Sequence, residues 1–146
     1  MIETWTLYFD GACWPNPGLS GSFGYHLHHN GELIASVSGI VQEPGEKSNN
    51  CAEYAGLCAG LKDYLERKPS LITHLNVYGD SQLVIKQMSG RWKIKDNNVL
   101  YTPYARRAQE VCKQIRKLGT KIIFTWIPRE HNEEADRLSK LHMEEK

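Results

Sequence analysis

The hydrophobic and polar positions divide the first third of the chain into short extended segments. Residues 4–10 are rich in aromatic and β-branched side chains and are predicted to form a strand that ends at Asp10. The next segment, WPNPGLSG, carries turn-forming residues throughout. Strand character resumes over residues 22–29, and Asn30-Gly31 is a strong hairpin signal before a return strand to about Val41. The pattern therefore predicts a three-stranded antiparallel meander.

The rest of the chain alternates between helical and extended patterns. After a polar loop, apolar residues recur at helical spacing from Asn50 until Pro69 closes the segment. A short strand is predicted over residues 75–78. A continuous apolar strand follows over residues 122–127, which is typical of a buried parallel position. Three further helices are predicted over residues 81–88, from Thr102-Pro103 to just before Gly119, and over residues 133–142.

This order of elements predicts an α/β fold in one domain spanning residues 1–146. A helical crossover makes the strand over residues 75–78 parallel to one of the first three strands. If it pairs with the first strand, Asp10 and Asp80 lie at the carboxyl ends of adjacent parallel strands, where open α/β sheets place their sites. Glu53, in the first turn of a helix, and Asp136, on the last helix, could reach the same edge.

The composition excludes little by itself. Hydrophobic residues make up 40% and charged residues 24% of the 146 residues, and the formal net charge is +1 with a sequence pI of about 7.7. Bulk charge therefore favours no class of partner. Basic residues crowd the second half of the chain, and a solvated helix face is the simpler explanation for such a cluster. These basic residues are Lys86, Arg91, Lys93, Lys95, Arg106, Arg107, Lys113, Arg116, Lys117 and Lys121.

The cysteines point to a reducing compartment. Cys13, Cys51, Cys58 and Cys112 form no CxxC pair and no zinc-ligand spacing. The N-terminus does not resemble a signal peptide, and no apolar stretch is long enough to span a membrane. We therefore expect free thiols in the cytoplasm, no membrane association, and a monomer without an obligate protein partner.

Four separate motifs each contain one acidic residue. They are FDGACWPNPG with Asp10, SNNCAEY with Glu53, YGDSQLV with Asp80, and HNEEADRLS with Asp136. In this order and spacing the motifs resemble ribonuclease HI, and the match spans nearly the whole chain. The resemblance implies a mixed five-stranded sheet, three antiparallel strands followed by two parallel ones, flanked by helices. It also implies endonucleolytic cleavage of the RNA strand of RNA–DNA hybrids, leaving 5′-phosphate and 3′-hydroxyl ends.

The resemblance further implies a site for two Mg²⁺ or Mn²⁺ ions. In the family pattern the residue matching Asp10 bridges both ions, those matching Glu53 and Asp80 hold one ion, and that matching Asp136 holds the other. The chemistry fits, because carboxylates suit Mg²⁺ and two such ions can activate water and stabilise the leaving oxygen of a phosphodiester.

Each acid also has a structural explanation. Glu53 could reach back to the start of its helix in a capping arrangement, and Asp80 could cap the helix that follows it. Asp136 could pair with Lys140 one turn along, and Asp10 could be a turn residue. The joint occurrence of the four motifs favours the catalytic interpretation.

The substrate contacts are also suggested by the resemblance. Selection for a hybrid requires detection of ribose 2′-hydroxyls, which the family achieves with backbone groups and short amides. Asn16, Asn49, Asn50 and Gln82 match those positions, and Ser48 matches a hydroxyl that contacts DNA phosphate. Turn formation is an alternative role for Asn16, and capping is one for Asn50.

The chain departs from the better-known bacterial enzymes after Gly90, where their additional basic helix and loop is missing. Trp92, among basic residues, could contact the DNA backbone or sugars, or could be buried and close the core. We expect modest, salt-dependent affinity for substrate. No separate hybrid-binding domain precedes Met1, so processive action is not expected from this chain alone.

A second departure is the shortened loop PREH before the last acid. The familiar enzymes carry a catalytic histidine in a longer, glycine-rich loop there. His131 is the candidate for that role, although a solvent-exposed histidine at a helix start is equally consistent, and Arg129 is the other candidate.

Two other functions compete with the ribonuclease interpretation. The first is an integrase or transposase catalytic domain of the same superfold, but those domains lack NNxAEY and DGAxxxNPG. The second is a catalytically weak module of this fold that only binds nucleic acid. Loss of catalysis usually removes a carboxylate, and all four are present.

Overall fold

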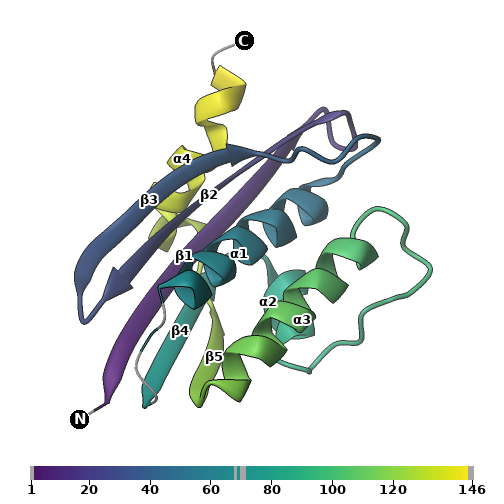
Figure 1. Cartoon of the computed structure of the whole chain (residues 1–146). Coiled ribbons are helices and arrows are strands. Elements are labelled where there is room, and N and C mark those ends of the chain that lie inside the picture. The colour runs from purple at the N-terminus through teal and green to yellow at the C-terminus, as the bar shows by residue number, and fades with distance from the viewer. Residues whose placement is uncertain (1, 68, 70–71, 145–146) are drawn as a thin grey trace.

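The computed structural model describes residues 2–67, 69 and 72–144, which build a mixed five-stranded sheet with helices on both faces (Figure 1). The strand order is β3-β2-β1-β4-β5, with β2 antiparallel to β1 and β3, and with β4 parallel to β1 and β5. The strands are β1 (Glu3–Trp14), β2 (Ser20–His29), β3 (Glu32–Ile40), β4 (Thr73–Gly79) and β5 (Thr120–Trp126). The helices are α1 (Asn49–Glu66), α2 (Gln82–Met88), α3 (Thr102–Lys117), the short 3-10 helix η1 (Arg129–His131) and α4 (Glu133–Glu144).

The predicted α/β fold and its mixed five-stranded sheet are confirmed, and β4 does pair with β1. Two details of the prediction are wrong. β1 does not end at Asp10 but stays paired with β2 as far as Trp14, opposite Ser20, so WPNPGLSG is not turn throughout. β5 is parallel as expected but forms an edge of the sheet, which leaves Ile123 and Trp126 exposed rather than buried.

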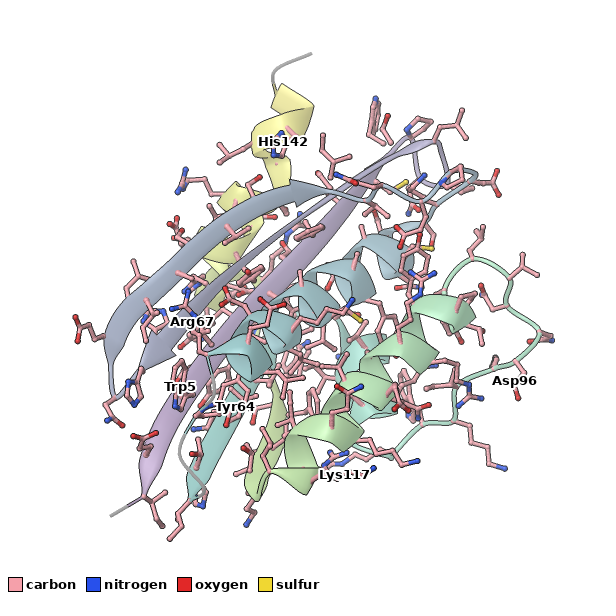
Figure 2. All side chains as sticks on the ribbon, in the orientation of Figure 1. Trp5, Tyr64, Arg67, Asp96, Lys117 and His142 are labelled. Carbon is pink, nitrogen blue, oxygen red and sulfur yellow. The ribbon has the colours of Figure 1, made fainter. Side chains whose placement is uncertain are left out.

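The main core lies between the sheet and the layer formed by α1, α2 and α3, in front of the sheet in Figure 1. Leu7 and Phe9 of β1 point into this layer and are fully buried. Figure 2 shows Trp5, near the start of β1, beside Tyr64, near the end of α1. Their rings meet edge to face with centroids 5.3 Å apart. Burial of this apolar face fixes α1 against β1.

Two glycines allow helices to approach the sheet closely on opposite faces. A Cβ on Gly11 would lie 2.2 Å from the backbone carbon of Ala52, so only glycine lets α1 pack so near β1. A Cβ on Gly24 would lie 2.4 Å from the Cβ of Leu138, on α4. Because Gly11 follows Asp10 directly and Gly24 pairs with Asp10, both helices converge on this acid.

None of the helices in the described residues has both the length and the apolar character needed to cross a membrane. The four cysteines are buried and free, in agreement with the prediction of free thiols.

Candidate active site

Three of the four predicted acids meet where the parallel pairing of β1 with β4 ends. Asp10 lies on β1, Asp80 directly follows β4, and Glu53 is near the start of α1. Because β1 and β4 are adjacent and parallel, they bring Asp10 and Asp80 to the same edge, and the close packing of α1 adds Glu53. Each of the three offers a carboxylate oxygen, and these oxygens all lie within 4.8 Å of one another.

The two innermost carboxylates share one hydrogen-bond donor. The backbone N–H of Gly11 donates to Oδ1 of Asp10 at 2.9 Å and to Oε1 of Glu53 at 3.0 Å. Asp10 is only 5% exposed and Glu53 only 6%. The second oxygen of Glu53, Oε2, is buried and has no hydrogen-bond partner among the described residues. An ionised carboxylate buried in this way lacks neutralisation.

The pKa values of Asp10 and Glu53 also reflect this uncompensated negative charge. Burial, together with a smaller effect of the nearby Asp80 carboxylate, raises the pKa of Asp10 to about 6. Burial likewise holds the pKa of Glu53 well above its ordinary value, with the negative charges of Asp10 and Asp80 adding to the effect. A bound divalent cation would supply the missing positive charge, so the donor set and its orphaned oxygen fit such an ion.

Asp136 lies beside this group in a different environment. Its carboxylate is 3.7 Å from the Arg129 guanidinium and 3.3 Å from the Lys140 ammonium. The pairing with Lys140 that the sequence offered as an alternative role is therefore present. The four acids line one cavity of about 320 Å³, together with Ala12, Asn49, Arg129 and Lys140.

The other structural explanations for the acids are wrong. Ser48 is the N-cap of α1, since its Oγ accepts a hydrogen bond from the Cys51 N–H, and Glu53 takes no part in the cap. Ser81, rather than Asp80, caps α2. Asp10 lies inside β1 and not in a turn. The carboxylates of Glu53, Asp80 and Asp10 therefore remain available to the cavity.

Asn132, which was not predicted from the sequence, forms hydrogen bonds to three parts of the site. Its buried Nδ2 donates to the Phe9 carbonyl at 2.9 Å and to Oδ2 of Asp80 at 3.0 Å. Its own carbonyl accepts the Asp136 N–H at 3.0 Å. One residue thus connects β1, the end of β4 and the start of α4. The signal in the sequence was an asparagine directly before the last helix, in HNEEADRLS.

The predicted substrate-binding amides lie around the start of α1 and α2. The Asn49 N–H donates to Oδ1 of Asn16 at 3.0 Å, and Asn49 itself lines the cavity. Asn50 is half-buried on the first turn of α1, and Gln82 is exposed as the first residue of α2. Ser48, the position predicted to contact DNA phosphate, is also the N-cap of α1.

Trp92 and His131 lie outside the cavity. Trp92 is 44% exposed, with the Lys86 ammonium 4.6 Å from its ring centroid, so the alternative of a core-closing tryptophan is wrong. His131 is exposed on η1 and does not line the cavity, whereas Arg129 of the same short helix does. The geometry therefore brings Arg129 nearer to the acids than His131.

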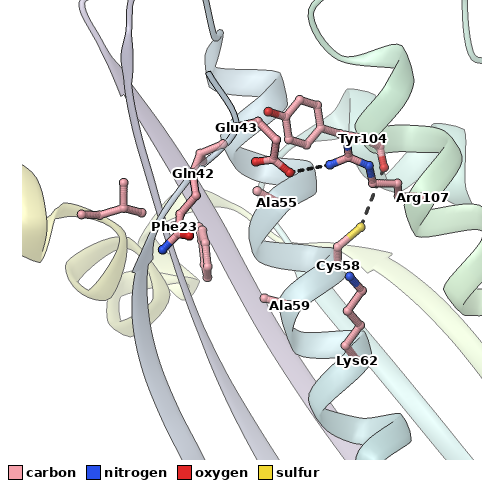
Figure 3. A pocket seen from close by; sticks show the side chains of 11 residues that line it. Phe23, Gln42, Glu43, Ala55, Cys58, Ala59, Lys62, Tyr104 and Arg107 are labelled. Atoms are coloured by element: carbon pink, nitrogen blue, oxygen red, sulfur yellow. Dashed lines mark hydrogen bonds and ion pairs between the residues drawn. The ribbon is translucent and has the colours of Figure 1, made fainter. Parts of the chain in front are cut away.

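Figure 3 shows a second cavity, of about 260 Å³, beside α1 and α3. Phe23 and Ala55 form part of an apolar wall, and the ion pair of Glu43 with Arg107 crosses its rim. Burial raises the pKa of the Cys58 thiol in its wall to about 11, which keeps the thiol protonated and unreactive. None of the candidate site residues lines this cavity.

Comparison with known proteins identifies the family. A family model described as Reverse transcriptase-like matches residues 8–142. The crystal structure of RNase H1 from the halophilic archaeon Halobacterium salinarum matches with a TM-score of 0.77 at 30% identity, covering 98% of this chain and 99% of that one. The chain belongs to the type 1 ribonuclease H family.

Other members of the ribonuclease H family agree with this assignment. The N-terminal RNase H domain of Rv2228c from Mycobacterium tuberculosis has a TM-score of 0.81 at 32% identity, over 97% of this chain and 94% of that one. LC11-RNase H1, solved in complex with an RNA/DNA hybrid, has a TM-score of 0.71 at 28% identity, over 92% of each chain.

The curated relatives are longer than this chain. The bifunctional protein Rv2228c of Mycobacterium tuberculosis is 38% identical over 132 residues, which are 89% of this chain but 33% of that protein. The chain thus spans about a third of the length of this relative.

Proposed function

We propose that this chain is a ribonuclease H, an endonuclease that hydrolyses the RNA strand of RNA–DNA hybrids and leaves 5′-phosphate and 3′-hydroxyl ends. The observation that carries the proposal is the group formed by Asp10, Glu53 and Asp80, whose oxygens lie within 4.8 Å of one another. A phosphodiester needs positioning and neutralisation of charge more than it needs a protein nucleophile. The hybrid found with the relative LC11-RNase H1 supports this choice of substrate.

Two divalent cations, Mg²⁺ or Mn²⁺, would serve this site. Asp10, Glu53 and Asp80 would hold one ion, and Asp10 with Asp136 would hold the other. When bound, the ions supply charge neutralisation and an activated water. The protein contributes a site with its carboxylates already gathered, while Asn132 orients Asp80 through its hydrogen bond of 3.0 Å. Asp136 must exchange the cationic side chains of Arg129 and Lys140 for its ion.

Recognition of the RNA strand falls to the amides near the cavity. Asn49 lines it, and Asn16 is joined to Asn49 by a hydrogen bond, so both are fixed beside the carboxylates. Asn50 and Gln82 complete the proposed readout of 2′-hydroxyl groups, which distinguish RNA from DNA. Ser48 and Trp92 are assigned to the DNA strand. The chain acts as a single domain over residues 1–146 and as a monomer, and its buried free thiols suit the reducing cytoplasm.

A cleavage assay tests the proposal directly. The substrates are a labelled RNA–DNA hybrid, an RNA duplex and a DNA duplex, each with Mg²⁺, with Mn²⁺ or with EDTA. We expect cleavage of the hybrid alone, in its RNA strand, and none in EDTA. Equal cleavage of the three duplexes would refute 2′-hydroxyl readout. Binding of the hybrid without cleavage under any metal would assign the chain instead to the nucleic-acid-binding modules.

A further inference from the structure

We propose that Trp14 extends the substrate-binding surface beyond the carboxylate cavity, as a platform against which a sugar ring of the hybrid packs. The inference rests on the proposed function, because it assigns a further contact to the same substrate. Trp14 is 72% exposed, although it is still paired in the sheet as the last residue of β1. An indole left this open buries little apolar surface and contributes little to folding.

The alternation of β1 places Trp14 in line with the cavity. Gly11 and Cys13 face α1, since a Cβ on Gly11 would contact α1 and Cys13 is buried. Asp10, Ala12 and Trp14 therefore share the other side of the strand. Asp10 and Ala12 both line the cavity, and Trp14 is the next side chain of this row. At a rise of ~3.4 Å per residue, Trp14 lies ~14 Å along the strand from Asp10. A duplex seated over the acids spans this distance within a few base pairs.

The backbone that carries Trp14 is fixed to the proposed substrate site. The Cys13 N–H donates to Oδ1 of Asn49 at 2.9 Å, and the Asn49 N–H donates to Oδ1 of Asn16 at 3.0 Å. Trp14 itself pairs with Ser20 across the ladder between β1 and β2. Cys13, directly before Trp14, and Asn16, two residues after it, are thus both hydrogen-bonded to Asn49, which lines the cavity. A platform held this way loses little conformational entropy when a ligand binds.

The chemistry favours nucleic acid as the occupant. In a duplex the base faces are already stacked on one another, so the sugar rings along the backbone are the surface that an exposed indole can cover, whatever the base sequence. Asn49, hydrogen-bonded to the Cys13 N–H beside Trp14, and Asn16, bonded in turn to Asn49, would contact the same nucleic acid. Leu19 is equally open, at 74% exposed, but it lies outside the ladder between β1 and β2 and outside the row that leads from the acids. Leu19 therefore provides a matched control.

The test measures binding without cleavage. The equilibrium dissociation constant of a labelled hybrid is determined by fluorescence anisotropy in EDTA over a range of salt concentrations. The proteins are the wild type and the variants Trp14→Ala, Trp14→Phe and Leu19→Ala. We expect Trp14→Ala to weaken binding about tenfold, as for the loss of one apolar contact between an indole face and a sugar ring, with Trp14→Phe restoring most of the affinity. The slope of log affinity against log salt stays unchanged, because no phosphate contact is lost. Leu19→Ala binds as the wild type does.

Cleavage kinetics separate this inference from the proposed function. With Mg²⁺, Trp14→Ala raises KM and leaves kcat close to that of the wild type. If the wild type cleaves the hybrid and Trp14→Ala binds it equally well, the inference is overturned and the proposed function stands. A reduced salt slope, or an equal loss in Leu19→Ala, also overturns it. A wild type that neither binds nor cleaves the hybrid overturns both. Thermal melting of Trp14→Ala at the wild-type temperature excludes unfolding as the cause.

Discussion

The two sides of the carboxylate cavity differ in how their negative charge is compensated. On one side Asp10, Glu53 and Asp80 are close together, and among the described residues no ion pair joins any of them to a lysine or arginine. On the other side Asp136 already has Arg129 and Lys140 as partners. Under the proposed two-ion mechanism, the fold itself would gather the ligands of one cation, whereas binding of the second would require Asp136 to change partners.

The two sides of the cavity also differ in how their charges affect folding stability. Asp10 and Glu53 are buried against each other, so their ionisation opposes folding until a cation arrives. The pairs made by Asp136 are partly exposed and contribute little to stability in either direction. A site that stores unfavourable charge on one side only should respond differently to substitutions on its two sides.

Asp10→Asn gives the largest effect that we expect. The variant loses hybrid cleavage, because the acid that would bridge both cations is gone, yet it keeps the fold. It is also more stable than the wild type without metal. The pKa of Asp10 rises from 3.8 to about 6 on folding, so the contribution of Asp10 to wild-type stability is full below pH 4 and is lost as the pH rises through 6. Two pKa units correspond to about 3 kcal/mol.

The measurement is chemical denaturation of both proteins in EDTA between pH 4 and 8. The stabilisation by Asp10→Asn should be absent near pH 4, reach its full size above pH 6, and shrink when Mg²⁺ is added. Asp96→Asn is the control, because Asp96 lies on an outlying loop, where Figure 2 labels it, and pairs with Arg106 of α3 away from the cavity. Substantial activity in Asp10→Asn would contradict the metal site. Identical pH profiles would contradict the uncompensated charge.

Asn132→Leu tests the residue that links the two sides. Leucine has a similar size but removes the donor to Asp80 and to the Phe9 carbonyl. Loss of these buried hydrogen bonds should destabilise the protein by about 3 kcal/mol. Turnover should fall, or the Mg²⁺ concentration for half-maximal activity should rise, by about 10–100-fold, as when an outer partner of a metal ligand is removed.

The Mg²⁺ titration of activity and the Mg²⁺-induced shift in melting temperature both measure this effect. Asn98→Ala is the matched control, because Asn98 also makes two hydrogen bonds, to the N–H groups of Leu100 and Tyr101. It should lower stability without moving the Mg²⁺ midpoint. An unchanged midpoint in Asn132→Leu would limit Asn132 to a purely structural role.

The sequence predicts the acid-rich edge better than the connections that hold it. Asp10 and Asp80 could be assigned to one edge because residue patterns identify strands and crossover rules fix their direction. The length of β1 could not be predicted, since Gly11-Ala12 has poor strand propensity and the tertiary pairing with Phe23 and Ser22 of β2 overrides it. The apolar run of β5 likewise does not distinguish a central strand from an edge. Asn132 went unnoticed because its contacts, to Phe9 and Asp80, are distant in sequence.

Removing the partners of Asp136 should have a smaller effect and of the opposite sign. Arg129→Gln combined with Lys140→Gln frees the Asp136 carboxylate, so the Mg²⁺ midpoint should fall by about two- to fivefold. Stability should change by less than about 1 kcal/mol, because both pairs are partly exposed. Arg137→Gln is the control, since Arg137 pairs with Glu134 on the same helix. A higher Mg²⁺ midpoint in the double variant would show that the side chains of Arg129 and Lys140 assist metal binding.

His131→Ala should produce the smallest change. His131 is exposed on η1 and, unlike Arg129, does not line the cavity. A general acid or base contributes about 10²–10⁴-fold to a rate. If His131 had that role, its removal would lower turnover almost as much as removal of a carboxylate. We expect turnover to fall by less than about fivefold, with an unchanged pH–rate profile. The measurement is kcat for hybrid cleavage between pH 6 and 9, with His142→Ala on α4 as the control. A hundredfold loss, together with a lost acidic limb in the pH profile, would place His131 in the reaction and show that η1 moves toward the cavity when substrate binds.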